Sequence, residues 1–85
     1  MRERFFFPEN KKAKRLSAKE QAQKVLEEAH EVAQAIENDE GDTRIIEETW
    51  DCIQACEGIL RKYGFMRVLG VRAMVKVKCA RRGDY

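Results

Sequence analysis

The 85-residue chain is long enough for one small domain, which by itself buries only a modest apolar core. Charged residues make up 38% of the sequence, and no apolar run approaches the roughly 18 residues that a membrane-spanning helix needs. The three cysteines form no Cys-x-x-Cys pair, and the first residues are too few and too charged for a signal peptide. We therefore expect a cytoplasmic protein with free thiols and no membrane contact.

Charge is strongly segregated along the chain. Residues 1–24 contain eight Lys or Arg and three Asp or Glu, residues 25–60 contain one and eleven, and residues 61–85 contain eight and one. The corresponding net charges are +5, −10 and +7. The basic ends favour a nucleic-acid partner, but the acidic centre argues against one, and we expect none. An acidic centre between basic flanks suits a metal–polyphosphate site, and helices that neutralise one another in a bundle are the alternative.

Residues 1–16 show no helical periodicity and predict an extended arm that is basic and aromatic. Phe5–Phe7 precede Pro8, which pushes the residue before it out of the helical region. We expect these aromatic rings to seal the end of a helical core, with stacking on a nucleobase as the alternative.

Ser17 and Glu20 have the spacing of a capping box, which predicts the start of a helix over residues 18–38. Four apolar residues follow at helical spacing, namely Val25, Ala29, Val32 and Ile36. The acidic stretch 38–42 predicts a turn, after which Asp42 or Thr43 is expected to cap a second helix that closes at Tyr63 and Gly64.

The second helix has a broad apolar face, wide enough to meet more than one neighbour. Its members are Ile45, Ile46, Thr49, Trp50, Ile53, Cys56 and Leu60. A third helix is predicted over residues 66–81, where helical spacing of apolar residues outweighs a short strand-like alternation with no second strand to pair with. The sequence thus predicts an all-α domain, a helical hairpin plus a C-terminal helix that completes a bundle by oligomerisation.

Two acidic pairs lie on the two predicted hairpin helices. Glu28 and Glu31 are three residues apart, as are Glu48 and Asp51, so each pair lies on one helical face. Folding back at the turn brings the pairs side by side, where four carboxylates repel one another unless a cation lies among them. Such hard oxygen ligands suit Mg²⁺ or Mn²⁺.

This arrangement resembles the MazG-like nucleotide pyrophosphohydrolases, whose signature is Glu-x-x-Glu, a spacer of a dozen to some two dozen residues, and Glu-x-x-Asp. Glu27 doubles the first position as Glu-Glu pairs in that family often do, and the ending from Lys78 to Gly83 is similar to the family's Lys-Asn-x-x-Arg-Gly. The resemblance covers roughly residues 17–85, so the chain divides into the arm, 1–16, and a MazG-like all-α domain, 17–85.

The resemblance implies an enzyme that assembles as a dimer or tetramer and uses Mg²⁺, with Mn²⁺ as a substitute. Such enzymes cleave a nucleoside triphosphate, ribo or deoxy, between its α and β phosphates and release the monophosphate and pyrophosphate. By the same resemblance, the catalytic and metal-binding residues are Glu28, Glu31, Glu48 and Asp51. The phosphate-binding residues are Lys78 and Arg82, joined by Lys24. Cys79 replaces the family asparagine.

Two other functions fit parts of the sequence. Glu27 and His30 form a Glu-x-x-His pair, which matches one arm of a dimeric di-iron bundle. A non-enzymatic helical dimer, with solvated carboxylates, is the plainer alternative.

Overall fold

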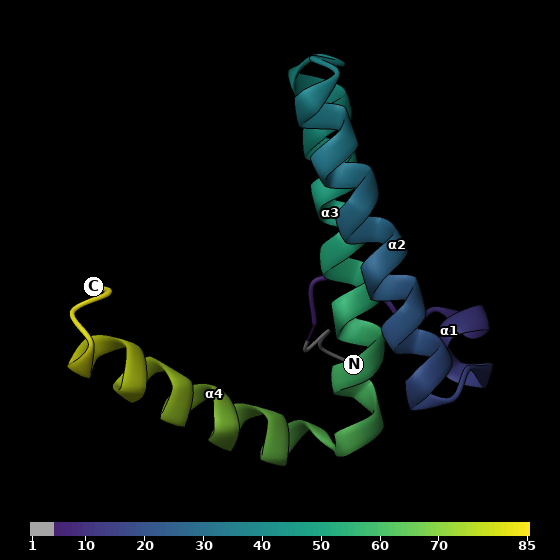
Figure 1. Cartoon of the computed structure of the whole chain (residues 1–85). Coiled ribbons are helices and arrows are strands. Elements are labelled where there is room, and N and C mark those ends of the chain that lie inside the picture. The colour runs from purple at the N-terminus through teal and green to yellow at the C-terminus, as the bar shows by residue number, and fades with distance from the viewer. Residues whose placement is uncertain (1–4) are drawn as a thin grey trace.

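The computed structural model describes residues 5–85, and every regular element in that range is a helix. In chain order these are α1 (Lys11–Arg15), α2 (Ala18–Glu37), α3 (Asp42–Leu60), the short 3₁₀ helix η1 (Arg61–Tyr63) and α4 (Phe65–Arg81). α2 and α3 run antiparallel as a long hairpin, while α4 leaves its base in another direction (Figure 1). The predicted all-α class is therefore confirmed.

Local sequence signals set most helix ends. The Ser17 hydroxyl accepts a hydrogen bond from the Glu20 backbone N–H at 3.1 Å, and the Glu20 carboxylate accepts one from the Ser17 N–H at 2.9 Å. This confirms the predicted capping box. α4 also lies where the third helix was predicted, after Gly64, whose φ of 75° turns the chain sharply.

The predicted cap of the second helix is wrong by one residue. Gly41 is the N-cap of α3, so Asp42 and Thr43 both lie inside the helix, and no side chain caps it. The reason is the backbone of the turn, where Gly41 has a φ of 95° that other residues rarely adopt.

The interface between α2 and α3 consists of small and polar residues spaced seven apart. These are Gln21, Glu28 and Ala35 on α2, with Glu48 and Ala55 on α3, and all five are buried. The Gln21 amide donates a hydrogen bond to the Ala55 carbonyl across the interface at 2.9 Å. Gly58 makes room for that amide, since a Cβ there would lie 2.6 Å from the Gln21 Nε2 atom. The two helices can therefore approach closely.

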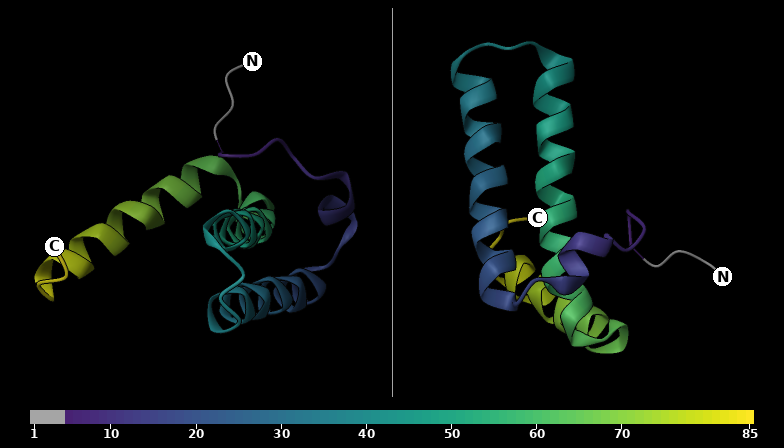
Figure 2. Two further views of the ribbon diagram at one scale, coloured as in Figure 1. Left: turned by 90° about the horizontal axis from the view of Figure 1, so that it is seen from above. Right: turned by 90° about the vertical axis from the view of Figure 1, so that its right-hand side faces the viewer.

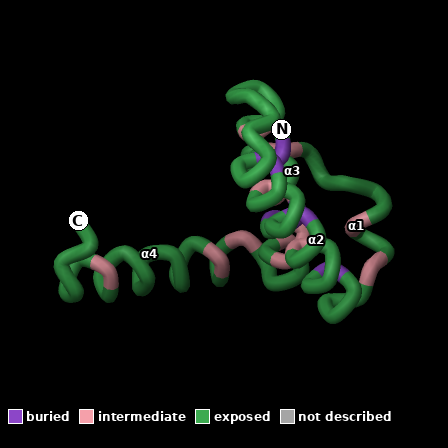
Figure 3. The backbone as a smooth tube through the Cα atoms, turned by 45° about the horizontal axis from the view of Figure 1, so that its top comes forward, coloured by how far each residue is buried: buried purple, intermediate pink, exposed green. Residues whose placement is uncertain are grey.

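The bulkier apolar residues of the two predicted apolar stripes are less buried than these five residues. Ala29 is exposed, and Ile36 and Ile46 each keep more than half of their surface accessible. Ala35 and Ala55 are the only buried apolar residues in the part of the chain that the structure describes. Figure 3 shows how little of the backbone is buried in the single chain. Because the close contact is made at small residues, the larger side chains point outward from the hairpin.

Several of those outward side chains line one apolar groove along the hairpin. Its volume is about 400 Å³, and its lining includes Ala29 and Val32 of α2 and Thr49, Cys52, Ile53, Cys56 and Leu60 of α3. Phe6 lies at the same groove. This groove leaves part of the predicted apolar faces of both hairpin helices open in the single chain.

The N-terminal segment was predicted to be extended, but part of it forms the helix α1. The Asn10 side chain accepts hydrogen bonds from the backbone N–H groups of Lys12 and Ala13, which starts this five-residue helix despite the lack of an apolar stripe. α1 lies at the base of the hairpin, at the end opposite the turn (Figure 2). The first four residues of the predicted arm lie outside the described range.

The arm is fixed to the end of α3 and to η1 by polar contacts. The Glu57 carboxylate, almost fully buried, accepts backbone hydrogen bonds from Phe6 at 2.9 Å and Phe7 at 3.1 Å. Arg61 donates to the Phe7 carbonyl at 2.6 Å, and Lys62 donates to the Leu16 carbonyl at 2.5 Å. These contacts hold the segment before α1 and the segment after it.

The aromatic residues of the arm pack edge to face on the helices. Phe6 and Phe7 each lie 5.7 Å from the Trp50 ring, and Phe5 lies 5.7 Å from the Phe65 ring. Phe5 and Phe7 are partly buried, whereas Phe6 remains 75% exposed. The rings thus pack on part of α3 and the start of α4, and one of them stays open to solvent.

α4 projects from the hairpin and has no buried residue. Among the described elements, its main contact is with η1 at its own start (Figure 1). Within residues 5–85, no helix is both long and apolar enough to cross a membrane.

Candidate metal centre

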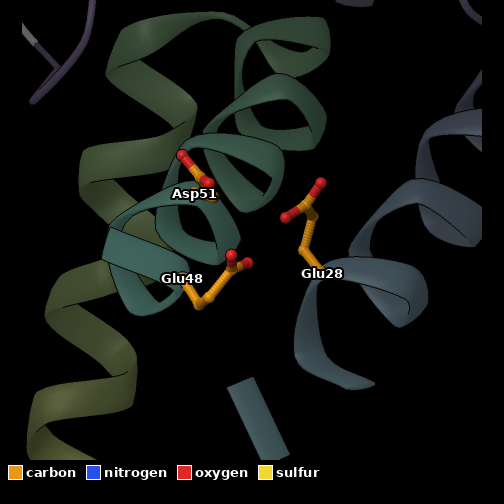
Figure 4. Close-up of side chains that lie close together, drawn as sticks. All are labelled: Glu28, Glu48 and Asp51. Atoms are coloured by element: carbon orange, nitrogen blue, oxygen red, sulfur yellow. The ribbon is translucent and has the colours of Figure 1, made fainter. Parts of the chain in front are cut away.

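Three carboxylates meet at the α2–α3 interface. Glu28 comes from α2, Glu48 and Asp51 come from α3, and one oxygen atom of each lies within 4.8 Å of the others. Figure 4 shows the three side chains directed toward a common space between the two helices. Glu28 is only 8% exposed and Glu48 only 3%, whereas Asp51 is exposed. The cluster therefore lies in the interface and opens to solvent beside Asp51.

Each buried glutamate has one paired oxygen and one unpaired oxygen. Lys24 contacts Glu28 Oε1 at 3.0 Å, and Arg44 contacts Glu48 Oε1 at 2.7 Å, both from one turn earlier in the same helix. Glu28 Oε2 and Glu48 Oε2 are buried without a hydrogen-bond donor among the described residues. A buried carboxylate oxygen without a partner is costly, and a divalent cation would satisfy both oxygens together. The set of oxygen donors fits Mg²⁺ or Mn²⁺.

The pKa values around the cluster reflect the crowding of negative charge. Burial, followed by the charges of Glu28 and Glu48, raises the pKa of the Asp51 carboxyl above its usual range. A hydrogen bond with Glu48, followed by the charge of Glu28, raises the pKa of Glu31. The hydrogen bond with Glu28 raises the pKa of the Lys24 ammonium. These shifts indicate a site that favours the binding of positive charge, whether a proton or a metal ion.

The structure brings most of the predicted acidic residues together. Glu28, Glu48 and Asp51 form the cluster, and Glu31, although exposed, is close enough to share a hydrogen bond with Glu48. Lys24 lies beside the cluster through its ion pair with Glu28. The helical spacing and the turn indicated that the two acidic pairs could meet, but not which faces of the helices would form the interface.

Lys78 and Arg82 are not brought to the cluster within one chain. Lys78 lies on α4 and Arg82 directly follows it, at the end that points away from the hairpin (Figure 1). Arg82 instead pairs with Asp84 at 2.7 Å and donates to the Cys79 sulfur at 3.3 Å. The physical reason is the turn at Gly64, which directs α4 away from α2.

Arg44 was missed, although its position carries a readable signal. It is the one basic residue between positions 25 and 60, and it precedes Glu48 by four residues. That spacing places a base and an acid on the same helical face. Arg44 also contacts Glu40 at 3.6 Å and Glu47 at 4.0 Å, so it is shared among several acids.

The pair that suggested a di-iron arm lies elsewhere. Glu27 and His30 are both exposed, and neither belongs to the carboxylate cluster. A bundle that holds iron between its helices needs such residues to point inward.

No protein-family model, curated protein or solved structure matches the chain. The functional argument therefore depends on the geometry and chemistry of the carboxylate cluster.

Proposed function

We propose that the chain is a Mg²⁺-dependent nucleoside triphosphate pyrophosphohydrolase of the MazG-like type, with Mn²⁺ as a substitute metal. The observation that carries this proposal is the burial of Glu28 and Glu48 at a helix–helix interface, each with an unpartnered oxygen beside the Asp51 carboxylate. Ion pairs at the other two oxygens offset only part of the cost of burying these charges. A bound divalent cation would contact the two unpartnered oxygens and offset the remaining cost of burying these charges.

In this proposal Glu28, Glu48 and Asp51 hold the metal, which would neutralise charge on the phosphate oxygens. Glu31 is exposed to water beside the cluster, where its interaction with Glu48 and then the charge of Glu28 raise its pKa. Its raised pKa suits a group that orients the attacking water and accepts its proton. Lys24 forms an ion pair with Glu28. A metal ion bound to Glu28 would neutralise that carboxylate, and Lys24 could then contact a phosphate. The products are the nucleoside monophosphate and pyrophosphate.

We also propose that the functional unit is a dimer or a tetramer. The apolar groove of α2 and α3 and the uncovered length of α4 leave large apolar side chains exposed, among them Met66, Met74 and Val75. A second copy would cover such surfaces. In a single chain Lys78 and Arg82 point away from the metal centre, so they would reach the phosphates only as residues of a second copy. We place this unit in the cytoplasm, where Cys52, Cys56 and Cys79 would remain free thiols, as they are in the structure.

The exposed apolar surface favours a second candidate, a non-enzymatic helical dimer. That candidate explains the groove but gives no reason for burying two glutamates. The enzyme and the non-enzymatic dimer can be distinguished by incubating the protein with a panel of ribo- and deoxynucleoside triphosphates and Mg²⁺, and measuring the pyrophosphate released. The enzyme produces pyrophosphate and the matching monophosphate in equal amounts and stops when Mg²⁺ is chelated. Release of no pyrophosphate from any of these nucleotides would favour the non-enzymatic dimer.

A further inference from the structure

A pocket of about 350 Å³ lies at the junction of α1, α2 and α3, beside the carboxylate cluster. Glu28 and Asp51 of the cluster line it together with Lys24, and α1 contributes Lys12. Gln54, a half-buried amide, lies on the α3 side. The residues that line the pocket therefore include two of the acids of the cluster, two lysines and a glutamine.

Lys12 is available to a ligand. Its side chain is exposed, and its ammonium forms no ion pair with any of residues 5–85. Lys24 differs from it, because its ammonium already contacts Glu28 at 3.0 Å. Lys12 is thus a lysine of the pocket lining that has no ion-pair partner within residues 5–85.

The position of Lys12 is fixed by the contacts of the arm. Asn10 caps the helix that carries it, Glu57 holds the backbone before that helix, and Lys62 holds the Leu16 carbonyl after it. Glu57 is 7% exposed, so a nearly buried charge is used to hold the arm in place. α1 therefore presents Lys12 to the pocket as part of the folded structure.

We propose that this pocket binds the phosphate chain of a metal-bound nucleotide, with Lys12 as an anion-binding residue in addition to Lys24. The proposal rests on the function proposed above. A triphosphate keeps negative charge beyond what one divalent ion neutralises, and ammonium groups beside the metal ligands are placed to meet it. Gln54 can donate its amide N–H groups to the same oxygens. The arm thereby becomes part of the binding site, and one chain supplies phosphate contacts without α4.

The test uses inorganic tripolyphosphate, which has the phosphate chain without base or sugar, in the presence of Mn²⁺. In the full-length protein, Lys12→Ala should raise the dissociation constant for Mn²⁺–tripolyphosphate about tenfold, the effect of one charge-assisted hydrogen bond. Lys12→Arg should restore most of the affinity. Lys11→Ala is the matched control, because Lys11 is exposed on the same short helix and does not line the pocket. Binding of Mn²⁺ alone should be equal in all four proteins.

The outcomes separate this proposal from the proposed function. Unchanged tripolyphosphate affinity in Lys12→Ala, in a chain that hydrolyses nucleotides, overturns the phosphate pocket and leaves the enzyme standing. Loss of affinity in Lys12→Ala, in a chain that hydrolyses no nucleotide, supports the pocket and overturns the enzyme. A wild-type chain that does not bind tripolyphosphate with Mn²⁺ overturns the pocket as well as the substrate class.

Discussion

Glu28 and Glu48 occupy positions where a helical hairpin ordinarily buries small or apolar side chains. Seven residues further along the same interface, Ala35 and Ala55 fill the corresponding positions. A charged side chain buried at such an interface position lowers the stability of the fold unless its charge is compensated. Lys24 and Arg44 compensate one oxygen of each glutamate and leave the other oxygen free.

The first prediction concerns Glu48→Gln. The amide keeps the shape of the side chain and removes one charge from the cluster, so the metal-free protein should melt at the same temperature or higher. Hydrolysis should fall roughly 100-fold or more, because a direct metal ligand is lost. The increase in melting temperature that Mg²⁺ gives the wild type by binding the native state should also disappear.

Glu37→Gln serves as the control for this change. Glu37 is exposed at the end of α2 and lies outside the cluster, so its removal should leave hydrolysis and the Mg²⁺ effect intact. Equal hydrolysis by Glu48→Gln and the wild type would rule out this glutamate as a metal ligand.

The second prediction concerns the pH dependence of stability. The pKa of Asp51 is raised by burial and by neighbouring carboxylates. The folded protein therefore binds this proton more tightly than the unfolded chain does. Its contribution to the free energy of unfolding is complete below the unfolded pKa, about 4, and is lost as pH rises through the folded pKa.

Melting curves of wild type and Asp51→Asn in chelator should show this difference between pH 4 and pH 7. Between these values the wild type should lose more stability, or gain less, than the variant. Mg²⁺ should stabilise the wild type more at pH 7 than at pH 5, because metal ligands must be deprotonated. The same pH dependence in both proteins would contradict the raised pKa of Asp51.

At the scale of the helices, the sequence predicted where they lie better than which sides meet. The Ser17–Glu20 capping box and Gly64 are local signals, and the helices begin or end at them. The α2–α3 interface was not predictable from apolar periodicity, because its contacts are made by Gln21, Glu28 and small residues. α1 was missed because a five-residue helix held by the Asn10 cap needs no apolar stripe.

The carboxylate cluster was predictable in part, for a different reason. Three-residue spacing places each acidic pair on one face of its own helix, and a short turn places the two helices side by side. The spacing does not fix which faces meet, so the meeting of Glu28 with Glu48 and Asp51 is seen only in the folded hairpin. The position of α4 was not constrained in this way, since it depends on the backbone angles at Gly64. The placement of Lys78 and Arg82 could therefore not be read from their spacing.

The third prediction tests the close approach of α2 and α3. Gly58→Ala would place a Cβ 2.6 Å from Nε2 and 2.8 Å from Cδ of Gln21, a fully buried side chain hydrogen-bonded to Ala55. The amide would have to move, so thermal or urea unfolding should show that the free energy of unfolding falls by about 1–3 kcal/mol.

Gly70→Ala on α4 is the matched control. A Cβ there meets nothing within 4 Å, and the variant should gain about 0.5–1 kcal/mol through helix propensity. A neutral Gly58→Ala would indicate that the hairpin is more open than described.

At the scale of the whole molecule, the single chain leaves its largest apolar side chains uncovered. Within residues 5–85 the buried apolar residues are Ala35 and Ala55, both small, and this burial is too little to stabilise a domain of this length. α4 carries apolar residues and the basic charge of the C-terminal third, while the hairpin carries the acidic charge. If the proposed oligomer forms, the hairpin of one copy and α4 of another would be complementary in charge as well as in apolar character.

The fourth prediction is that the folded protein is an oligomer at micromolar concentration, measured by sedimentation. Ile53→Glu places a charge in the apolar groove and should shift the protein toward monomer with loss of helicity. Glu47→Lys, at an exposed position outside that groove, serves as the control for a change of charge on α3. A well-folded wild-type monomer would overturn the prediction.

Trp50 gives the molecule an optical property that follows from its position. It is the single tryptophan of the sequence, it directly precedes Asp51, and Phe6 and Phe7 pack against its ring. The indole is 42% exposed, so its fluorescence is sensitive both to solvent and to the neighbouring carboxylate. All tryptophan emission from the chain therefore originates where the arm meets α3, next to Asp51 of the carboxylate cluster. Occupation of the site by a cation and detachment of the arm can each be followed in the unlabelled protein.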